Sequence, residues 1–223
     1  MQKYQITITG TQPLLLHHDD IEWADRMDAW KSNPDNKKNS VPGDDRTPPF
    51  RWIGCLYHDK ENVIIPTENI MRSLMEGAAM VMVPKGRNGK TFKAQSQSGI
   101  LPDGIGWTLL VRNGKKVPIA PILELIDQPN KLFHAHTKEA EKMGFDLFSK
   151  RAKIGTSKHI RVRPRFLNWS ATGTLTVIDP QITEEVLTNI FDCAGSYKGL
   201  GDWRPSSKTP GTWGTFSADV KAI

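Results

Sequence analysis

The sequence predicts an α+β fold, a ferredoxin-like sheet with insertions, in a single domain that spans residues 1–223. Two segments with helical periodicity alternate with about four strand-like segments, which is the element pattern of that class. Hydrophobic side chains make up 38% of the chain, which suffices for a sizeable core at this length. The insertions are expected at about residues 17–60 and about residues 84–159.

The first expected element is a strand over residues 4–10, where polar and apolar residues alternate and β-branched residues are frequent. Residues 13–16 extend this strand after a bulge. Residues 21–31 carry two tryptophans and a methionine at helical spacing among several acids, so they are expected to form an acidic helix. The polar residues 32–49 are rich in Asn, Asp, Lys and Pro and are expected to form an exposed, mobile loop.

A second strand and the first core helix are expected next. Residues 50–57 are apolar and predicted to be extended, and residues 62–66 are predicted to form a short buried strand. Thr67 can cap a helix that ends near Val83, just before a proline. Gly77 lies inside this helix, which indicates close packing against a sheet.

The middle of the chain contains the clearest predicted hairpin. Its strands are residues 107–111 and 116–120, and the Asn-Gly pair between them favours a type I′ turn. Residues 137–153 are charged and prone to form a helix. Residues 160–166 and 173–178 alternate and are expected to pair with each other.

The composition excludes several classes of protein. No run approaches the roughly 18 apolar residues of a membrane span, and the N-terminus lacks a signal-peptide pattern, so we expect a cytoplasmic protein without a membrane partner. Cys55 and Cys193 are far apart and lack zinc-site spacing, so reduced thiols are expected. Nothing in the sequence requires a cofactor. The net charge of +6 favours a polyanionic partner.

The most specific charge pattern lies between residues 150 and 165, where seven cations occur without an acid. Arg161, Arg163 and Arg165 alternate, so in a strand they share one face, where they repel one another unless an anion lies across them. We therefore predict a nucleic-acid-binding surface; the alternative is a solvated edge strand whose charge prevents aggregation. The other cations predicted to join this surface are Lys85, Arg87, Lys90, Arg151, Lys153 and Lys158.

A glycine-rich loop over residues 194–216 follows the last predicted helix, residues 183–193. Glycine lets the main chain approach an anionic ligand closely. Lys198 and Arg204 add charge, and Trp203 and Trp213 add faces on which a base could stack. The alternative is a long loop whose glycines only permit tight turns.

Candidate chemistry is confined to the run His17-His18-Asp19-Asp20. Adjacent residues in an extended chain point to opposite sides, so no convergent metal site is predicted. Asp19 or Asp20 is the candidate for assisting RNA cleavage by holding a divalent ion. No nucleophile motif is recognisable, so binding without turnover is predicted. An acidic patch near the start of the chain could face the basic surface of a neighbouring copy in a self-assembling protein; it comprises Asp19, Asp20, Glu22, Asp25 and Asp28.

The order of these features resembles the RAMP (repeat-associated mysterious protein) superfamily, especially the backbone subunits of CRISPR effectors that polymerise along guide RNA. The resemblance covers both ends of the chain and not its middle. It is carried by the opening strand, residues 4–9, and by Ile-Pro-Thr-Glu-Asn-Ile-Met-Arg at residues 65–72. It is also carried by the last helix with the residues Gly195, Gly199, Gly201, Gly211, Gly214 and Phe216.

The resemblance implies a modified RNA-recognition-type ferredoxin core, a projecting hairpin or thumb that separates bases, and head-to-tail assembly. Residues 107–120 are the candidate thumb. Asp19 and Asp20 follow the first strand, roughly where some RAMP relatives carry a target-cleaving aspartate. The loop Gly-Asp-Trp-Arg-Pro-Ser-Ser departs from the serine- and arginine-rich loop of guide-RNA backbones. The implied contacts with the nucleic-acid backbone are Arg72, Lys198, Gly199, Gly201 and Arg204.

The expected function is that of a non-catalytic subunit that binds single-stranded nucleic acid, RNA before DNA, and oligomerises along the strand. The expected partners are RNA or single-stranded DNA, copies of itself and other subunits of a CRISPR effector in antiviral defense. Two alternatives are a RAMP-type endoribonuclease and a phage protein that binds or mimics a CRISPR subunit.

Overall fold

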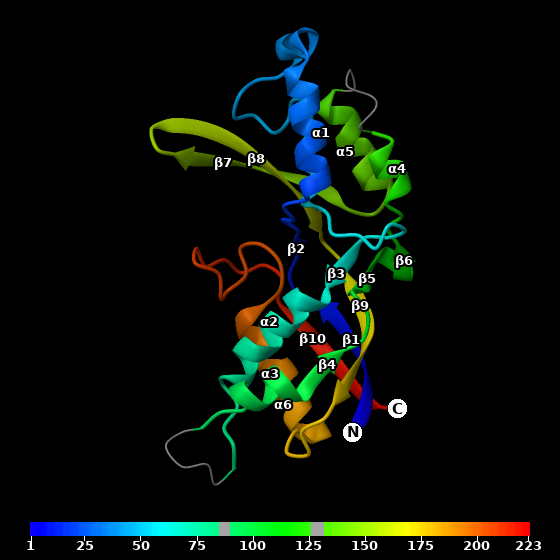
Figure 1. Cartoon of the computed structure of the whole chain (residues 1–223), viewed down its shortest axis with the longest axis vertical. Coiled ribbons are helices and arrows are strands. Elements are labelled where there is room, and N and C mark those ends of the chain that lie inside the picture. The colour runs from blue at the N-terminus through cyan, green and yellow to red at the C-terminus, as the bar shows by residue number, and fades with distance from the viewer. Residues whose placement is uncertain (85–89, 126–131) are drawn as a thin grey trace. The chain divides into compact units, whose positions relative to one another are not determined.

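The structure, a computed structural model, describes residues 1–84, 90–125 and 132–223 (Figure 1). The chain divides into two compact units, each built from separate stretches. Both combine antiparallel strands with helices, so the α+β class is confirmed. The first unit comprises Met1–Leu14, Ile64–Lys116 and Asn168–Ile223; the second comprises Leu15–Val63 and Val117–Leu167. Residues 93–116 thus belong to the first unit, although they fall in a predicted insertion.

The first unit is organised around an antiparallel sheet with the strand order β10-β1-β9-β5-β3. A short strand, β4, pairs with β9 next to β5, and β6 pairs with β5. The strands are β1 (Gln2–Gly10), β3 (Ile64–Pro66), β4 (Ile100–Pro102), β5 (Gly106–Val111), β6 (Lys115–Lys116), β9 (Ser170–Val177) and β10 (Phe216–Ala222).

Three helices lie together on one side of this sheet in Figure 1: α2 (Thr67–Ala78), α3 (Lys93–Gly99) and α6 (Glu184–Cys193). The alternation of β1 places Tyr4, Ile6 and Ile8 in the core, as its sequence pattern predicts. Gly173 lies opposite Ile6 in the neighbouring strand and must be glycine, because a Cβ there would overlap the indole of Trp107.

The second unit packs helices against the long hairpin formed by β7 (Asp146–Ile154) and β8 (Ser157–Phe166). Its core contains buried aromatic side chains, among them Trp52, Phe145 and Phe166, and the rings of the last two stack at 5.0 Å. His136 is fully buried and accepts a hydrogen bond at 3.3 Å from the Trp52 indole. The other elements are α1 (Ile21–Ser32), α4 (Ala120–Leu123), α5 (Phe133–Lys142) and the 3-10 helices η1 (Pro34–Asn39) and η2 (Ile53–Cys55); β2 (Leu14–Leu15) spans the boundary between the units.

Several predicted elements are wrong in the middle of the chain. The helix expected over residues 137–153 ends at Lys142, because Gly144 adopts a φ of 94°, and strand β7 follows. Residues 160–166 pair with β7 and not with residues 173–178, which pair with β1 and β4. Residues 50–57 contain the 3-10 helix η2 and are not an extended strand.

Asn113 and Gly114 both have positive φ, as the predicted turn requires, but Val111 pairs with Lys115, so the connection has three residues and is not the two-residue type I′ turn. The hairpin around it is short, because β6 has two residues and α4 starts at Ala120. Its first strand, β5, pairs on both sides within the sheet of the first unit. The segment 107–120 is therefore not a projecting thumb.

No helix within the described ranges combines the length and the apolar character needed to cross a membrane.

The close packing predicted at Gly77 is present, but its partner is α6 and not a sheet. A Cβ on Gly77 would lie 2.7 Å from both the Ile190 carbonyl oxygen and the Ala194 nitrogen. Backbone atoms cannot move aside as a flexible side chain can, so the contact between α2 and α6 depends on this glycine.

The substitution Gly77→Ala tests this packing by the sign of its effect. In an exposed helix the change would stabilise the protein by up to about 1 kcal/mol, because alanine has the higher helix propensity. Here we expect a loss of about 1–3 kcal/mol in the free energy of unfolding, owing to overpacking. Urea unfolding followed by circular dichroism measures the difference. A stabilised variant would contradict the close contact between α2 and α6.

Candidate nucleic-acid interface

The glycine-rich loop of the first unit is closed upon itself. Helix α6 continues into a π-helical turn, η5 (Ala194–Lys198), after which Gly199 and Gly201 have positive φ. The Leu200 N–H donates to the Gly214 carbonyl at 2.9 Å, and a Cβ on Gly214 would overlap that segment. These glycines are therefore required by turns and close chain crossings, as the alternative interpretation of the loop expects.

A carboxylate on α2 connects this loop to the helix. The Glu76 carboxylate forms ion pairs with two arginines. Arg204 comes from the loop, and its Nη1 lies 3.4 Å from Glu76 Oε2; Arg72 comes from the preceding turn of α2. Partial burial of Glu76 opposes its ionisation, but hydrogen bonds from Ser206 and Arg72 and the charge of Arg204 outweigh this effect. The pKa of Glu76 therefore lies below the usual glutamate range. We call these four residues the Glu76 cluster.

The structure thus brings together Arg72 and Arg204, two predicted contact residues that are far apart in sequence, and pairs both with Glu76. The Arg72 side chain is 67% exposed and remains accessible to a ligand. Trp203 packs edge-to-face against Trp213 at 6.2 Å. Lys198 is half-buried at the end of η5.

Tyr197 was not predicted as a site residue, although it is 59% exposed. It precedes Lys198 on η5, so an aromatic ring and a cation are adjacent on the surface of the first unit. The signal in the sequence was the pair Tyr-Lys directly before the first loop glycine.

The hairpin β7–β8 carries the basic segment of the second unit. Its register places Arg161, Arg163 and Arg165 on one face, opposite Lys150, Phe148 and Asp146 of β7, respectively. The prediction that the three arginines share a face is therefore confirmed.

The expectation that these arginines need an external anion is corrected, because the chain supplies carboxylates. Asp45 is 7% exposed and lies 3.1 Å from Arg161 and 3.9 Å from Arg163. Arg165 pairs with Asp146 at 2.5 Å, and this hydrogen bond raises the pKa of the guanidinium. Each of the three arginines therefore lies within ion-pair distance of a carboxylate of the chain, and Arg161 and Arg163 share one.

The loop that contains Asp45 is hydrogen-bonded along β8. The Asp45 N–H donates to the Ile160 carbonyl at 3.0 Å, and the Ile160 N–H donates to the Gly43 carbonyl at 2.8 Å. The Asp45 carboxylate also accepts the Val162 N–H at 3.2 Å. Main-chain pairing thus places this carboxylate between the two arginines, although Asp45 and Arg161 are 116 positions apart.

The opposite face of the hairpin carries three further predicted contact residues, Arg151, Lys153 and Lys158. All three are exposed, and Lys153 lies directly opposite Lys158. No carboxylate pairs with any of them in the part of the chain that the structure describes. Like charges directly across a strand pair destabilise it, so this face is suited to an anion. We call these three residues the tip cations.

The acidic run near the first strand has structural roles. Asp20 caps α1 by accepting the Trp23 N–H at 3.1 Å, and its carboxylate lies 3.8 Å from His58. Asp19 is exposed. His18 stacks on Tyr57 at 4.4 Å. Residues 1–84, 90–125 and 132–223 hold no group of three His, Cys, Asp or Glu side chains that could bind a metal ion.

The other basic loop is only partly described. Lys85 and Arg87, both predicted contact residues, lie outside the described residues. Lys90 is exposed, and its carbonyl accepts the Val83 N–H at 2.9 Å. Their role in binding remains a prediction.

Comparison of the chain with protein-family models and with curated proteins finds no match. The likeness to RAMP proteins therefore remains a resemblance in the residues quoted above. A proposal for the function of the chain therefore depends on the charges and contacts of the described residues.

Replacing the central carboxylate of the Glu76 cluster should give a pH-dependent loss of stability. Because folding lowers its pKa, the Glu76 carboxylate stabilises the protein fully above the unfolded pKa of about 4.3, and this contribution is lost as the pH falls through the folded pKa. We expect Glu76→Gln to lower the free energy of unfolding by about 1–2 kcal/mol at neutral pH, and the difference to shrink in acid. Urea titrations at several pH values measure it. The control is Glu61→Gln, a change at an exposed position. If the free energy of unfolding of the unaltered protein and of both variants depends on pH in the same way, the Glu76 cluster is contradicted.

Removing the shared carboxylate of Arg161 and Arg163 should destabilise the second unit. We expect Asp45→Asn to cost about 2–4 kcal/mol, because two half-buried guanidiniums would then lose the charged carboxylate that they share. The neighbouring Asp44→Asn breaks only a more exposed pair with Arg46 and should cost less than about 1 kcal/mol. Thermal unfolding of the two variants gives the comparison. Equal effects would show that burial of the Asp45 pair is unimportant.

Proposed function

We propose that this chain binds single-stranded nucleic acid and that the tip cations on the β7–β8 hairpin are its main phosphate contacts. The observation that carries this proposal is the position of Lys153 directly opposite Lys158, with Arg151 on the same face. A phosphate chain that crosses this face would relieve the repulsion between the cations and release counterions. The tip cations would contact phosphates and not the edges of the bases, so binding would show little sequence preference.

Exposure favours the tip cations over the three arginines of β8. Figure 1 shows the turn of the β7–β8 hairpin lying away from α1 and α5 of the same unit. A strand of nucleic acid can therefore approach the turn without displacing the core of the second unit. The arginines, in contrast, would have to exchange Asp45 and Asp146 for phosphate.

We further propose a modified ferredoxin-like core of the RNA-recognition type for the first unit. Its elements follow in the order β1, α2, β5, β9, α6 and β10, and the corresponding strands lie in the order β10-β1-β9-β5. This order matches the β-α-β-β-α-β arrangement of that fold, with β3, β4, β6 and α3 as additions, and so supports the proposal. The fold supports a RAMP-like protein but not by itself a function.

The finer features of the proposal depend on the RAMP resemblance. They are a preference for RNA over DNA, oligomerisation along the strand as a backbone-type subunit, partnership with other CRISPR effector subunits, and a cytoplasmic location. The exposed acids Glu22, Asp25 and Asp28 on α1 offer a surface of opposite charge to the tip cations of another copy. Such complementarity favours head-to-tail contacts between copies.

A charge-reversal variant tests the proposed interface. We expect Lys153→Glu with Lys158→Glu to lower the affinity for a single-stranded oligonucleotide by at least about tenfold, and the salt slope of binding to fall by about 1.4, since two phosphate contacts are lost. Fluorescence anisotropy of a labelled oligonucleotide over a range of salt concentrations measures both values.

The matched control is Lys115→Glu with Lys116→Glu, which changes the same charge on the exposed strand β6. If both double variants lose the same affinity, only the net charge matters and the proposed interface is wrong. The triple alanine variant of Arg161, Arg163 and Arg165 is less informative, because it also unpairs Asp45 and Asp146.

The identity of the polymer requires a separate measurement. The absorbance ratio at 260 and 280 nm of the natively purified protein, with its size before and after RNase or DNase, identifies any bound strand. A large particle that collapses with RNase alone supports an RNA-bound oligomer. A low ratio from a monomer counts against the backbone-type subunit.

A further inference from the structure

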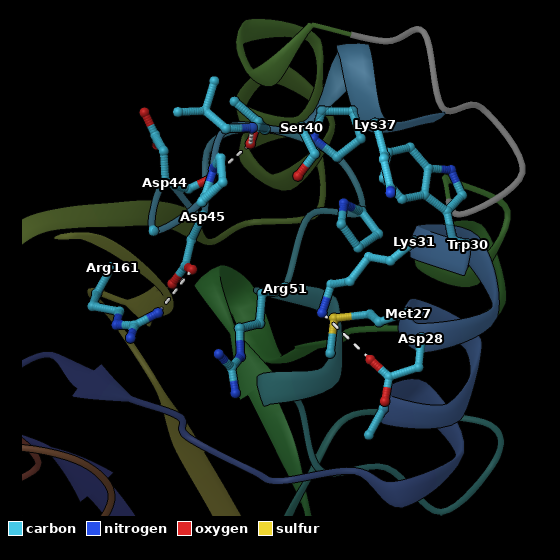
Figure 2. Close-up of a pocket in the computed structure, with 17 residues that line it drawn as sticks. Met27, Asp28, Trp30, Lys31, Lys37, Ser40, Asp44, Asp45, Arg51 and Arg161 are labelled. Atoms are coloured by element: carbon cyan, nitrogen blue, oxygen red, sulfur yellow. Dashed lines mark hydrogen bonds and ion pairs between the residues drawn. The ribbon is translucent and has the colours of Figure 1, made fainter. Parts of the chain in front are cut away.

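We propose that the second unit contains a binding pocket for a single nucleotide, with one part for the base and one for the phosphate. The pocket has a volume of about 750 Å³, within the range of small-molecule sites. It lies between α1 and the loop of residues 40–51, and Figure 2 shows the side chains that both segments contribute. All of its lining residues belong to the second unit.

One part of the lining suits a planar, weakly polar group. Met27 and Trp30 are three residues apart on α1, so they share a face of the helix, and Trp30 is half-buried. The loop adds Pro42, Pro48 and Pro49 to the same lining. An indole face and apolar ring surfaces of this kind favour stacking of a nucleobase.

The charges of the lining leave an excess of cations. Each carboxylate in the pocket already has a cationic partner within the chain: Asp28 has Lys31, Asp44 has Arg46, and Asp45 has Arg161. Lys37 and Arg51 also line the pocket, and neither pairs with a carboxylate among residues 1–84, 90–125 and 132–223. An anionic group on the ligand would complete this set of charges.

The backbone at each of these two cations is held by contacts of neighbouring residues. Arg51 is exposed between Phe50 and Trp52, which are both buried and fix its position. Lys37 lies on η1, which is attached to α1 because the Asn36 side chain donates to the Trp30 carbonyl at 2.9 Å. Arginine suits phosphate in particular, because its planar fork can donate two parallel hydrogen bonds.

The loop wall of the pocket is also hydrogen-bonded internally. The Thr47 hydroxyl donates to the Asp44 carbonyl at 2.8 Å and accepts the Val41 N–H at 3.1 Å. The Asp45 ion pairs attach the same loop to β8. A preformed wall lowers the ordering cost of binding a small ligand.

The inference does not depend on the proposed function, because a mononucleotide can occupy the pocket whether or not a polymer binds the tip cations. The shared chemistry, a base joined to a phosphate, has two sources. It can be a free mononucleotide or an unstacked nucleotide of a bound strand.

Isothermal titration of the full chain with AMP, adenosine and ribose 5-phosphate separates the two parts of the pocket. We expect AMP to bind saturably at one site, more tightly than either fragment. Arg51→Ala should lower the affinity for AMP and for ribose 5-phosphate by about tenfold or more, because one charge-assisted contact with phosphate is lost. The affinity for adenosine should not change. Trp30→Ala should lower the affinity for AMP and adenosine and leave the affinity for ribose 5-phosphate unchanged.

Two controls keep the outcome specific. Lys38→Ala removes a neighbouring charge outside the lining of the pocket, and Arg26→Ala removes an exposed charge from α1; both should bind AMP as the unaltered chain does. Arg51 is exposed, so its variant is expected to fold even where Trp30→Ala does not. The inference is overturned if AMP gives no saturable binding up to about 1 mM, or if Arg51→Ala and Lys38→Ala bind it equally.

Competition identifies the source of the nucleotide. If a short single-stranded oligonucleotide displaces AMP, the pocket takes a nucleotide of the strand. If AMP stays bound while the oligonucleotide binds elsewhere, the ligand is a free nucleotide. The variant with Lys153→Glu and Lys158→Glu should still bind AMP, so a failure of polymer binding is distinguishable from a failure of the pocket.

Discussion

The second unit depends on one buried carboxylate. The Asp45 carboxylate accepts hydrogen bonds from the Arg161 guanidinium and from the Val162 N–H, and it lies within ion-pair distance of Arg163. A buried charge with several hydrogen-bond donors is stable only while all of its partners are in place, so these contacts fix the loop of residues 40–51 against β8. That attachment forms one wall of the pocket and reduces the positive charge of one face of the hairpin.

The same principle divides the cations of the chain into two groups. Arg161, Arg163, Arg165, Arg72 and Arg204 are paired with carboxylates of their own unit and contribute to its structure. The tip cations, Lys37 and Arg51 have no such pairing in the described part of the chain. An anionic ligand binds most readily where its charge displaces no carboxylate and only water must be released. We therefore place the proposed ligand sites by the pairing of cations within the chain and not by the number of cations.

The local structure of single segments was predictable from the sequence, and the residues that contact those segments from elsewhere in the chain were not. Strand alternation correctly placed Arg161, Arg163 and Arg165 on one face, because the side-chain period of a strand depends on neighbouring residues alone. The pairing of Arg161 and Arg163 with Asp45 depends on the fold, because Asp45 and Arg161 are 116 positions apart in the chain. Similarly, Gly77 signalled close packing but not that its partner is α6. Helix periodicity failed over residues 137–153, because the positive φ of Gly144 ends α5.

The two proposed ligand sites of the second unit share the hairpin but use different cations. Arg161 lines the pocket from one face of β8, whereas Lys158, Lys153 and Arg151 lie on the opposite face of the hairpin. The Asp45 carboxylate cancels much of the charge of Arg161 and Arg163, so the field of the pocket comes mainly from Lys37 and Arg51. The Ile160 N–H donates to the carbonyl of the pocket residue Gly43 at 2.8 Å, so the wall of the pocket begins two positions along β8 from Lys158. A strand on the tip cations and a nucleotide in the pocket would therefore affect each other through direct competition, through movement of the hairpin or through their charges.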